Sequence, residues 1–180
     1  GSKAQVLNVI DPAVEYVRQS YPGKTIGLIG TKQTVFSGVY KNKLEKADDS
    51  IVLKSLATPL LVPMIEEGFF NNNISESIIE NYLMDTHLQG IEALILGCTH
   101  YPLIKGQIER FYQGKVKVID SSETVAKKLK SLLEDLQLLT HTHTQSNKSF
   151  YVSDFTESFE ASTKIFFGHS IELLHYKLWE

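Results

Sequence analysis

The sequence predicts an α/β fold with a mainly parallel sheet flanked by helices. Short apolar runs that end at a glycine or a polar residue alternate with longer amphipathic stretches over the first 138 residues. Strands that alternate with helices of this length are typical of crossover units, which build parallel sheets. The composition agrees, because 42% hydrophobic and 22% charged residues among 180 suit an ordinary globular core.

Four short apolar segments are the predicted strands, at residues 25–30, 50–56, 93–96 and 116–119. The predicted helices cover residues 11–20, 31–46, 60–70, 74–87, 102–112 and 123–136. We assign Asp11 as the N-cap of the first helix and Pro12 as its first residue, since both are favoured there. The sequence Asp-Ser-Ser at 120–122 is predicted to cap the last helix.

The remaining residues predict a linker and a short C-terminal unit. Residues 139–149 are polar and lack periodicity, so they are the predicted linker. A strand is predicted at 150–152, a helix at 156–167 and an apolar terminal element at 171–179. His141 and His143 alternate in the linker, but no cysteine or nearby carboxylate completes a ligand set, so we predict no metal site.

Charge and cysteine content exclude several classes of partner. A net charge of −3 and a pI near 6.1 give no electrostatic reason to expect nucleic acid. No apolar stretch is long enough to cross a bilayer. The single cysteine excludes an internal disulfide and fits a reducing cytoplasm. Gly1-Ser2 reads as the remnant of a cleaved tag, so residues 1–5 are expected to be a lead-in.

The stretch ALILGCTHYPLI at residues 93–104 carries the most chemical information. Its apolar run stops at Gly97, and Cys98, Thr99 and His100 follow directly. Open α/β sheets bind ligands at the carboxyl ends of their strands. A nearby helix start and an imidazole two residues away both favour the thiolate. We therefore predict Cys98 as a nucleophile or base, with His100 as its acid–base partner.

Two further groups follow strands and are expected to reach the same sheet edge. Thr31 and Thr34 open a helix, where hydroxyls and backbone N–H groups suit a carboxylate ligand. Glu66 suits an ammonium group. Structural roles remain open for each residue: threonines as helix caps, Glu66 on a solvated face, and His100 bonded to a turn. A lone cysteine in a small domain is also often inert.

Five short motifs occur in the order expected of one known family. They are VIDP at 9–12, GTKQTV at 30–35, ATPLLVPMIEEG at 57–68, GCTHYPLI at 97–104 and DSS at 120–122. In this order they resemble the opening of the second lobe, the Thr-x-x-Thr helix start, the loop before a glutamate, the second cysteine motif and a later strand end of bacterial glutamate racemases. The resemblance covers about residues 6–180.

The resemblance implies an enzyme without a cofactor that interconverts L- and D-glutamate for peptidoglycan synthesis. In this family two cysteines face opposite sides of the substrate α-carbon; one removes a proton and the other delivers one. The implied catalytic residues here are Cys98, His100 and Glu66. The implied substrate-binding residues are Thr31, Thr34, Thr99 and His100.

The resemblance also implies how the chain is divided. Family members begin with an Asp-Ser-Gly motif, a Pro-Tyr-Gly loop and a first Cys-Asn-Thr motif, and none of these occurs here. We therefore expect a second lobe at residues 6–138, a linker at 139–149 and a segment at 150–180 that in the family returns to the first lobe. Such a chain is expected to lack activity alone. The segment 150–180 is expected to pack against another copy or to leave apolar surface exposed.

Other functions stay open at this point. A related enzyme, such as aspartate racemase or a malonate decarboxylase, is one alternative, although Thr-His-Tyr-Pro after Cys98 argues against it. A non-catalytic ligand-binding domain of flavodoxin-like architecture is another. The expected partner is free glutamate in the cytoplasm, with a homodimer left open, and neither nucleic acid nor membrane is expected.

Overall fold

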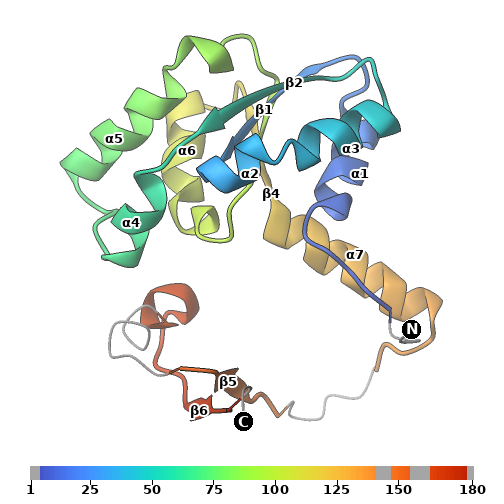
Figure 1. Ribbon diagram of the computed structural model, residues 1–180, viewed down its shortest axis with the longest axis vertical. Helices are drawn as coiled ribbons and strands as arrows, with labels where there is room; N and C mark the ends of the chain where they lie inside the picture. The colour runs from blue at the N-terminus through green and yellow to red at the C-terminus, as the bar shows by residue number, and fades with distance from the viewer. Residues whose placement is uncertain (1–4, 141–146, 155–162, 178–180) are drawn as a thin grey trace.

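A four-stranded parallel sheet forms the centre of the computed structural model, which describes residues 5–140, 147–154 and 163–177 (Figure 1). Its strands, in spatial order, are β2 (Val52–Ala57), β1 (Thr25–Gly30), β3 (Ala93–Leu96) and β4 (Lys117–Asp120). Every neighbouring pair is parallel, which confirms the predicted fold class.

The strand order creates a switch point at the centre of the sheet. The chain moves outward from β1 to β2 and then crosses to the other side of β1 for β3 and β4. Loops that leave the carboxyl ends of β1 and β3 therefore turn to opposite faces of the sheet. In open α/β sheets ligands bind in the crevice at this point.

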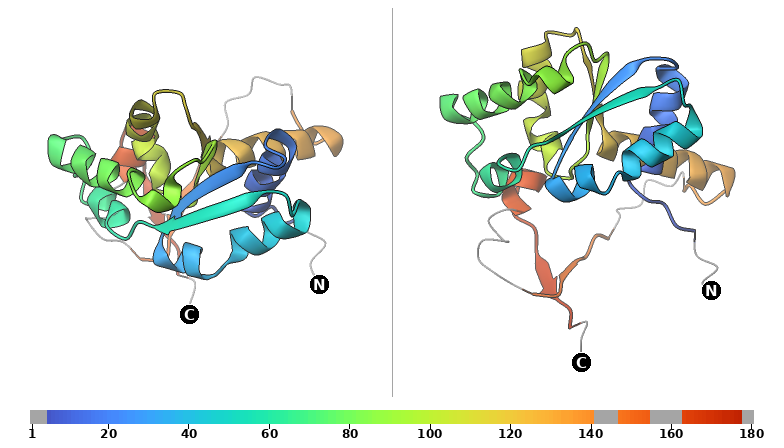
Figure 2. Two further views of the ribbon diagram at one scale, coloured as in Figure 1. Left: turned by 90° about the horizontal axis from the view of Figure 1, so that it is seen from above. Right: turned by 45° about the horizontal axis from the view of Figure 1, so that its top comes forward.

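Helices cover both faces of the sheet (Figure 2). One face packs on α1 (Asp11–Ser20) and α3 (Val39–Ala47). The other packs on α4 (Leu61–Glu66), α5 (Asn73–Leu83), α6 (Lys105–Tyr112) and the short 3-10 turns η1 (Thr86–Leu88) and η2 (Tyr101–Ile104). α2 (Lys32–Phe36) follows β1, and α7 (Ser121–Asp135) lies beside α1 and extends past the sheet (Figure 1).

The two apolar cores alternate along the central strands. Ala93 and Ile95 belong to the core beneath α1 and α3, whereas Leu94 and Leu96 belong to the core on the opposite face. All four side chains are fully buried. A strand covered on both faces reads as a continuous apolar run, which explains why the run before Cys98 has no polar alternation.

The start of the first predicted helix and the continuity of the second need correction. Asp11 is the first helical residue of α1 rather than its N-cap. The side-chain oxygen of Asn8 accepts hydrogen bonds from the backbone N–H groups of Ile10 (3.0 Å) and Asp11 (2.8 Å). Asn8 therefore caps the start of this helix in place of Asp11. The helix predicted at 31–46 is divided into α2 and α3, because Gly38 adopts a left-handed φ of 66° between them.

Two other helices end earlier than predicted. α4 stops at Glu66, and Gly68 at φ 69° turns the chain away. α5 stops at Leu83, and a separate 3-10 turn, η1, follows. The early end of α4 matters for the site, because it leaves Glu66 at the helix terminus.

The C-terminal unit forms a small sheet of its own. β5 (Phe150–Val152) pairs in parallel with β6 (Leu173–His175), and residues 163–167 between them are helical (Figure 1). These elements confirm the predicted strand and the last part of the predicted helix. The rest of that helix, and both linker histidines, lie outside the described residues. Tyr151 and Tyr176 are 60% and 58% exposed, in agreement with the apolar surface expected there.

Candidate active site

The loops that follow β1 and β3 meet at the switch point. A Cβ built on Gly30 would lie 3.2 Å from the Cγ2 atom of Thr34, and one built on Gly97 would lie 3.5 Å from the same atom. The Thr34 methyl group therefore packs over both glycines. A Cβ on Gly97 would also lie 2.9 Å from the backbone oxygen of Ile29, so a larger residue there would separate the loops. The predicted convergence of Thr34 with the start of the cysteine loop is confirmed.

Thr31 and Thr34 form a hydroxyl pair beside this junction. Thr31 is the N-cap of α2, and its Oγ1 atom accepts a hydrogen bond from the Thr34 N–H at 3.2 Å. The two hydroxyl oxygens are 3.0 Å apart, so one donates to the other. This bond uses one hydroxyl proton and leaves the other to donate to a ligand. The capping interpretation is thus correct, and it is compatible with carboxylate binding.

Cys98, His100 and Glu66 form a connected chain of polar atoms. Cys98 Sγ lies 3.6 Å from His100 Nδ1, and His100 Nε2 lies 3.0 Å from Glu66 Oε1. Because a carboxylate only accepts, Nε2 carries a proton toward Glu66, and in a neutral ring Nδ1 then presents its lone pair to the thiol. The arrangement of nucleophile, imidazole and orienting carboxylate is the one that activates thiols. Glu66 is therefore not simply a solvated surface residue, and His100 is not simply bonded to the backbone of a turn.

The electrostatics of Cys98 differ from the sequence-based expectation. Burial raises the pKa of the thiol above its ordinary value, and the Glu66 carboxylate raises it further. Hydrogen bonds from the backbone N–H groups of His100 and Thr99 lower the pKa, but less than burial and the Glu66 carboxylate together raise it. The net direction of the pKa shift is therefore opposite to the expectation that this loop favours the thiolate.

Thr99 contributes its main chain to the sulfur, whereas its side chain is exposed. Its predicted contact with a substrate carboxylate remains a prediction. The described part of the chain holds no group of three or more His, Cys, Asp or Glu side chains placed to bind a metal. Within the same residues, no helix is long and apolar enough to span a membrane.

A buried pair, Thr58 and Tyr101, holds the site together and was missed by the sequence analysis. Their hydroxyl oxygens lie 2.6 Å apart, and Thr58 Oγ1 also donates to the backbone oxygen of Gly30 at 3.2 Å. Both side chains are fully buried. They join the ends of β1 and β2 to the turn that follows Cys98. The signal in the sequence is a threonine between Ala57 and Pro59, inside the motif at 57–68.

A parallel α/β fold with a thiol, an imidazole and a carboxylate in contact at its switch point is the class of structure that the described residues form. The sequence profile of the Asp/Glu/Hydantoin racemase family matches residues 2–129. The chain therefore belongs to this family.

Named relatives agree in sequence and in fold. The glutamate racemase of Aquifex aeolicus is 36% identical over 167 residues, which are 93% of this chain and 61% of the relative. A crystal structure of the Francisella tularensis glutamate racemase in complex with D-glutamate is 35% identical, with a TM-score of 0.83 over 97% of this chain and 64% of that one. The crystal structure of a glutamate racemase isoform from Bacillus anthracis is 27% identical. Its TM-score is 0.87 over 99% of this chain and 66% of that one. This chain thus spans less than two thirds of the first relative.

Proposed function

We propose that this chain carries one of the two proton-transfer groups of a glutamate racemase, and that Cys98 is that group. The observation that carries the proposal is the connection from Cys98 through His100 to Glu66. A protonated thiol delivers its proton to the α-carbon of the substrate and becomes a thiolate. In the reverse direction the thiolate takes the α-proton. His100 exchanges a proton with the sulfur through Nδ1, and Glu66 orients the ring and stabilises its charged form.

Glutamate is the proposed substrate because the relatives reported above are glutamate racemases, one of them bound to D-glutamate. The spare hydroxyl proton of the Thr31–Thr34 pair and the exposed Thr99 are proposed to hold its carboxylates. Aspartate is the alternative substrate within the same family. The supply of D-glutamate for peptidoglycan is part of this proposal, as is a cytoplasmic location, which would keep the free thiol reduced.

We further infer that racemisation needs a second thiol that this chain does not contain. Cys98 is the only cysteine among the 180 residues. A single base cannot both remove a proton from one face of the α-carbon and return one to the other face. The proposed lobe at 6–138, linker at 139–149 and returning segment at 150–180 follow the same reasoning. We expect no turnover of L-glutamate by this chain alone when optical rotation is followed.

Protection of Cys98 from alkylation tests the site directly. The rate of modification by iodoacetamide is measured by mass spectrometry with and without D- or L-glutamate. We expect glutamate to slow the reaction and equal concentrations of aspartate to slow it less. A Thr34→Val variant, which keeps the shape of the side chain, should lose protection. Modification that is indifferent to both amino acids would contradict the proposed binding site.

A homodimer is a further part of the proposal. The support is apolar surface on the C-terminal unit, where Tyr151 and Tyr176 are exposed and contact each other. Light scattering after gel filtration measures the mass. A monomer at every concentration tested would contradict a homodimer.

A further inference from the structure

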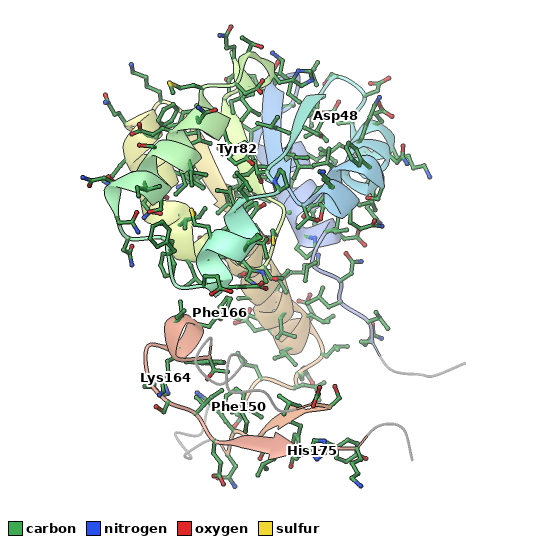
Figure 3. All side chains as sticks on the ribbon, turned by 60° about the vertical axis from the view of Figure 1, so that its left-hand side comes forward. Asp48, Tyr82, Phe150, Lys164, Phe166 and His175 are labelled. Carbon is green, nitrogen blue, oxygen red and sulfur yellow. The ribbon has the colours of Figure 1, made fainter. Side chains whose placement is uncertain are left out.

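The helical segment 163–167 lies against the candidate active site. The ring of Phe166 contacts the imidazole of His100, with ring centroids 5.5 Å apart and planes at 72°. Figure 3 shows Phe166 on the side of the segment that faces the α/β layers. The preceding residue anchors it, because Ile165 packs on the apolar core and its Cδ1 lies 3.7 Å from the position of a Cβ on Gly68. The contact with His100 thus comes from a seated element.

Neighbouring phenylalanines of this segment point to different parts of the molecule. The ring of Phe167 contacts the rings of Phe150 of β5 and His169, with ring centroids 5.1 Å and 6.4 Å apart. In Figure 3, Phe150 lies among the strands of the small sheet, away from Phe166. Phe167 therefore holds the segment to the C-terminal sheet, whereas Phe166 contacts the site.

The His100 ring has two polar partners and one aromatic neighbour. Both nitrogens are committed, Nδ1 to the thiol of Cys98 and Nε2 to the carboxylate of Glu66. The Glu66 side chain that holds Nε2 is itself about half exposed, so water competes for this hydrogen bond and a further contact strengthens the orientation of the ring. An edge-to-face aromatic neighbour restricts rotation of the imidazole and covers its carbon atoms from water.

We propose that Phe166 is a positioning residue for His100, which keeps Nδ1 directed at the thiol of Cys98. This rests on the proposed function, in which His100 exchanges a proton with that thiol. The C-terminal segment thereby contributes to the site without touching the substrate. Leucine at this position fills space but supplies no aromatic edge or face, so the imidazole regains access to its other rotamers.

The test compares Phe166→Leu with the matched control Phe167→Leu, and adds Phe166→Tyr, which retains the ring. The first readout is the tautomer of His100, from ¹⁵N shifts of the imidazole, assigned with a His100→Gln variant. We expect Nε2–H to dominate in the parent protein, in Phe166→Tyr and in Phe167→Leu. Phe166→Leu should give averaged shifts of a mobile ring.

The second readout is the alkylation rate of Cys98 at pH 7. The rate should fall in Phe166→Leu by up to about threefold, the limit in which all three staggered χ1 wells of His100 become equally populated. Phe167→Leu and Phe166→Tyr should stay near the parent rate, and circular dichroism confirms that each variant is folded.

Two outcomes would overturn the proposal. One is a Phe166→Leu variant with an unchanged tautomer and rate; the other is an equal loss in Phe167→Leu, which would reduce the effect to seating of the segment. Neither readout needs glutamate. Failure of the proposed function appears instead as alkylation that glutamate does not slow, so the two failures are distinguishable.

Discussion

The two sheets of this protein have the same parallel pairing and opposite degrees of burial. The side chains of β3 are fully buried between two layers of helices, whereas β5 and β6 expose Tyr151 and Leu174. Both sheets satisfy their backbone groups along the paired edge. We therefore expect cover by helices, more than strand pairing, to stabilise the central sheet, since apolar burial is the larger driving force.

The small sheet relies on contacts between aromatic rings. Phe150 packs on Phe167. Tyr151 packs on Tyr176 across the strand pair, with ring centroids 6.1 Å apart. A two-stranded sheet with such limited cover is marginally stable in water. The large and small sheets are therefore expected to respond very differently to the same perturbation.

Amide hydrogen exchange should reveal the largest difference. Amides of Leu94 and Ile95 are expected to exchange only through global unfolding, with a free energy of roughly 5–15 kcal/mol. Amides of Tyr151 and Leu174 should open locally at a cost near zero to about 2 kcal/mol. Equal protection of the two sheets would mean that the small sheet has a cover of its own.

Truncation of a leucine in each sheet sharpens the same comparison. Leu94→Ala should lower the free energy of unfolding by about 2–5 kcal/mol, because it empties space in a closed core. Leu174→Ala should change it by less than about 0.5 kcal/mol. Urea denaturation followed by circular dichroism measures both values, and similar losses would show that the small sheet is part of the cooperative core.

Removal of a tyrosine hydroxyl should have a smaller effect that again depends on burial. Tyr101→Phe leaves the buried Thr58 hydroxyl with one partner fewer and should cost about 1–2 kcal/mol. Tyr151→Phe removes a hydroxyl from an exposed side chain and should be neutral. A thermal melt distinguishes them, and a neutral Tyr101→Phe would remove Thr58 and Tyr101 from the structural support of the site.

An exposed ion pair at the edge of the large body should have the smallest effect. Lys128 on α7 lies 3.0 Å from Glu15 on α1, with both side chains more than 40% exposed. Lys128→Gln should change stability by less than about 1 kcal/mol, and high salt should reduce the difference. A larger loss of stability would mean that α7 depends on this ion pair for its packing against α1.

The central strands were predictable because their signal is local. The runs at 25–30 and 93–96 are short, apolar and bounded by glycine, and the structure contains β1 and β3 at those residues. The helix at 31–46 is predicted as continuous, and Gly38 falls inside it. The left-handed conformation of that one residue is what divides it.

The candidate site was predicted residue by residue but not as a geometry. Cys98 and His100 are two positions apart, so their proximity follows from the chain, whereas the pairing of His100 with Glu66 requires α4 to end beside the turn after β3. Thr58 and Tyr101 are 43 positions apart, and no local pattern predicts their contact. Phe166 approaches from still further along the chain.

The sequence by itself determined the strand and helix alternation, the parallel sheet and the position of the only thiol at a strand end. These follow from residue order and hydrophobic periodicity. Only the tertiary structure decided the partners of that thiol and the direction in which its pKa moves. The reason is physical: burial and charge depend on which distant segments surround the sulfur. Around Cys98, burial and the Glu66 carboxylate together outweigh the N–H groups that the local sequence supplies.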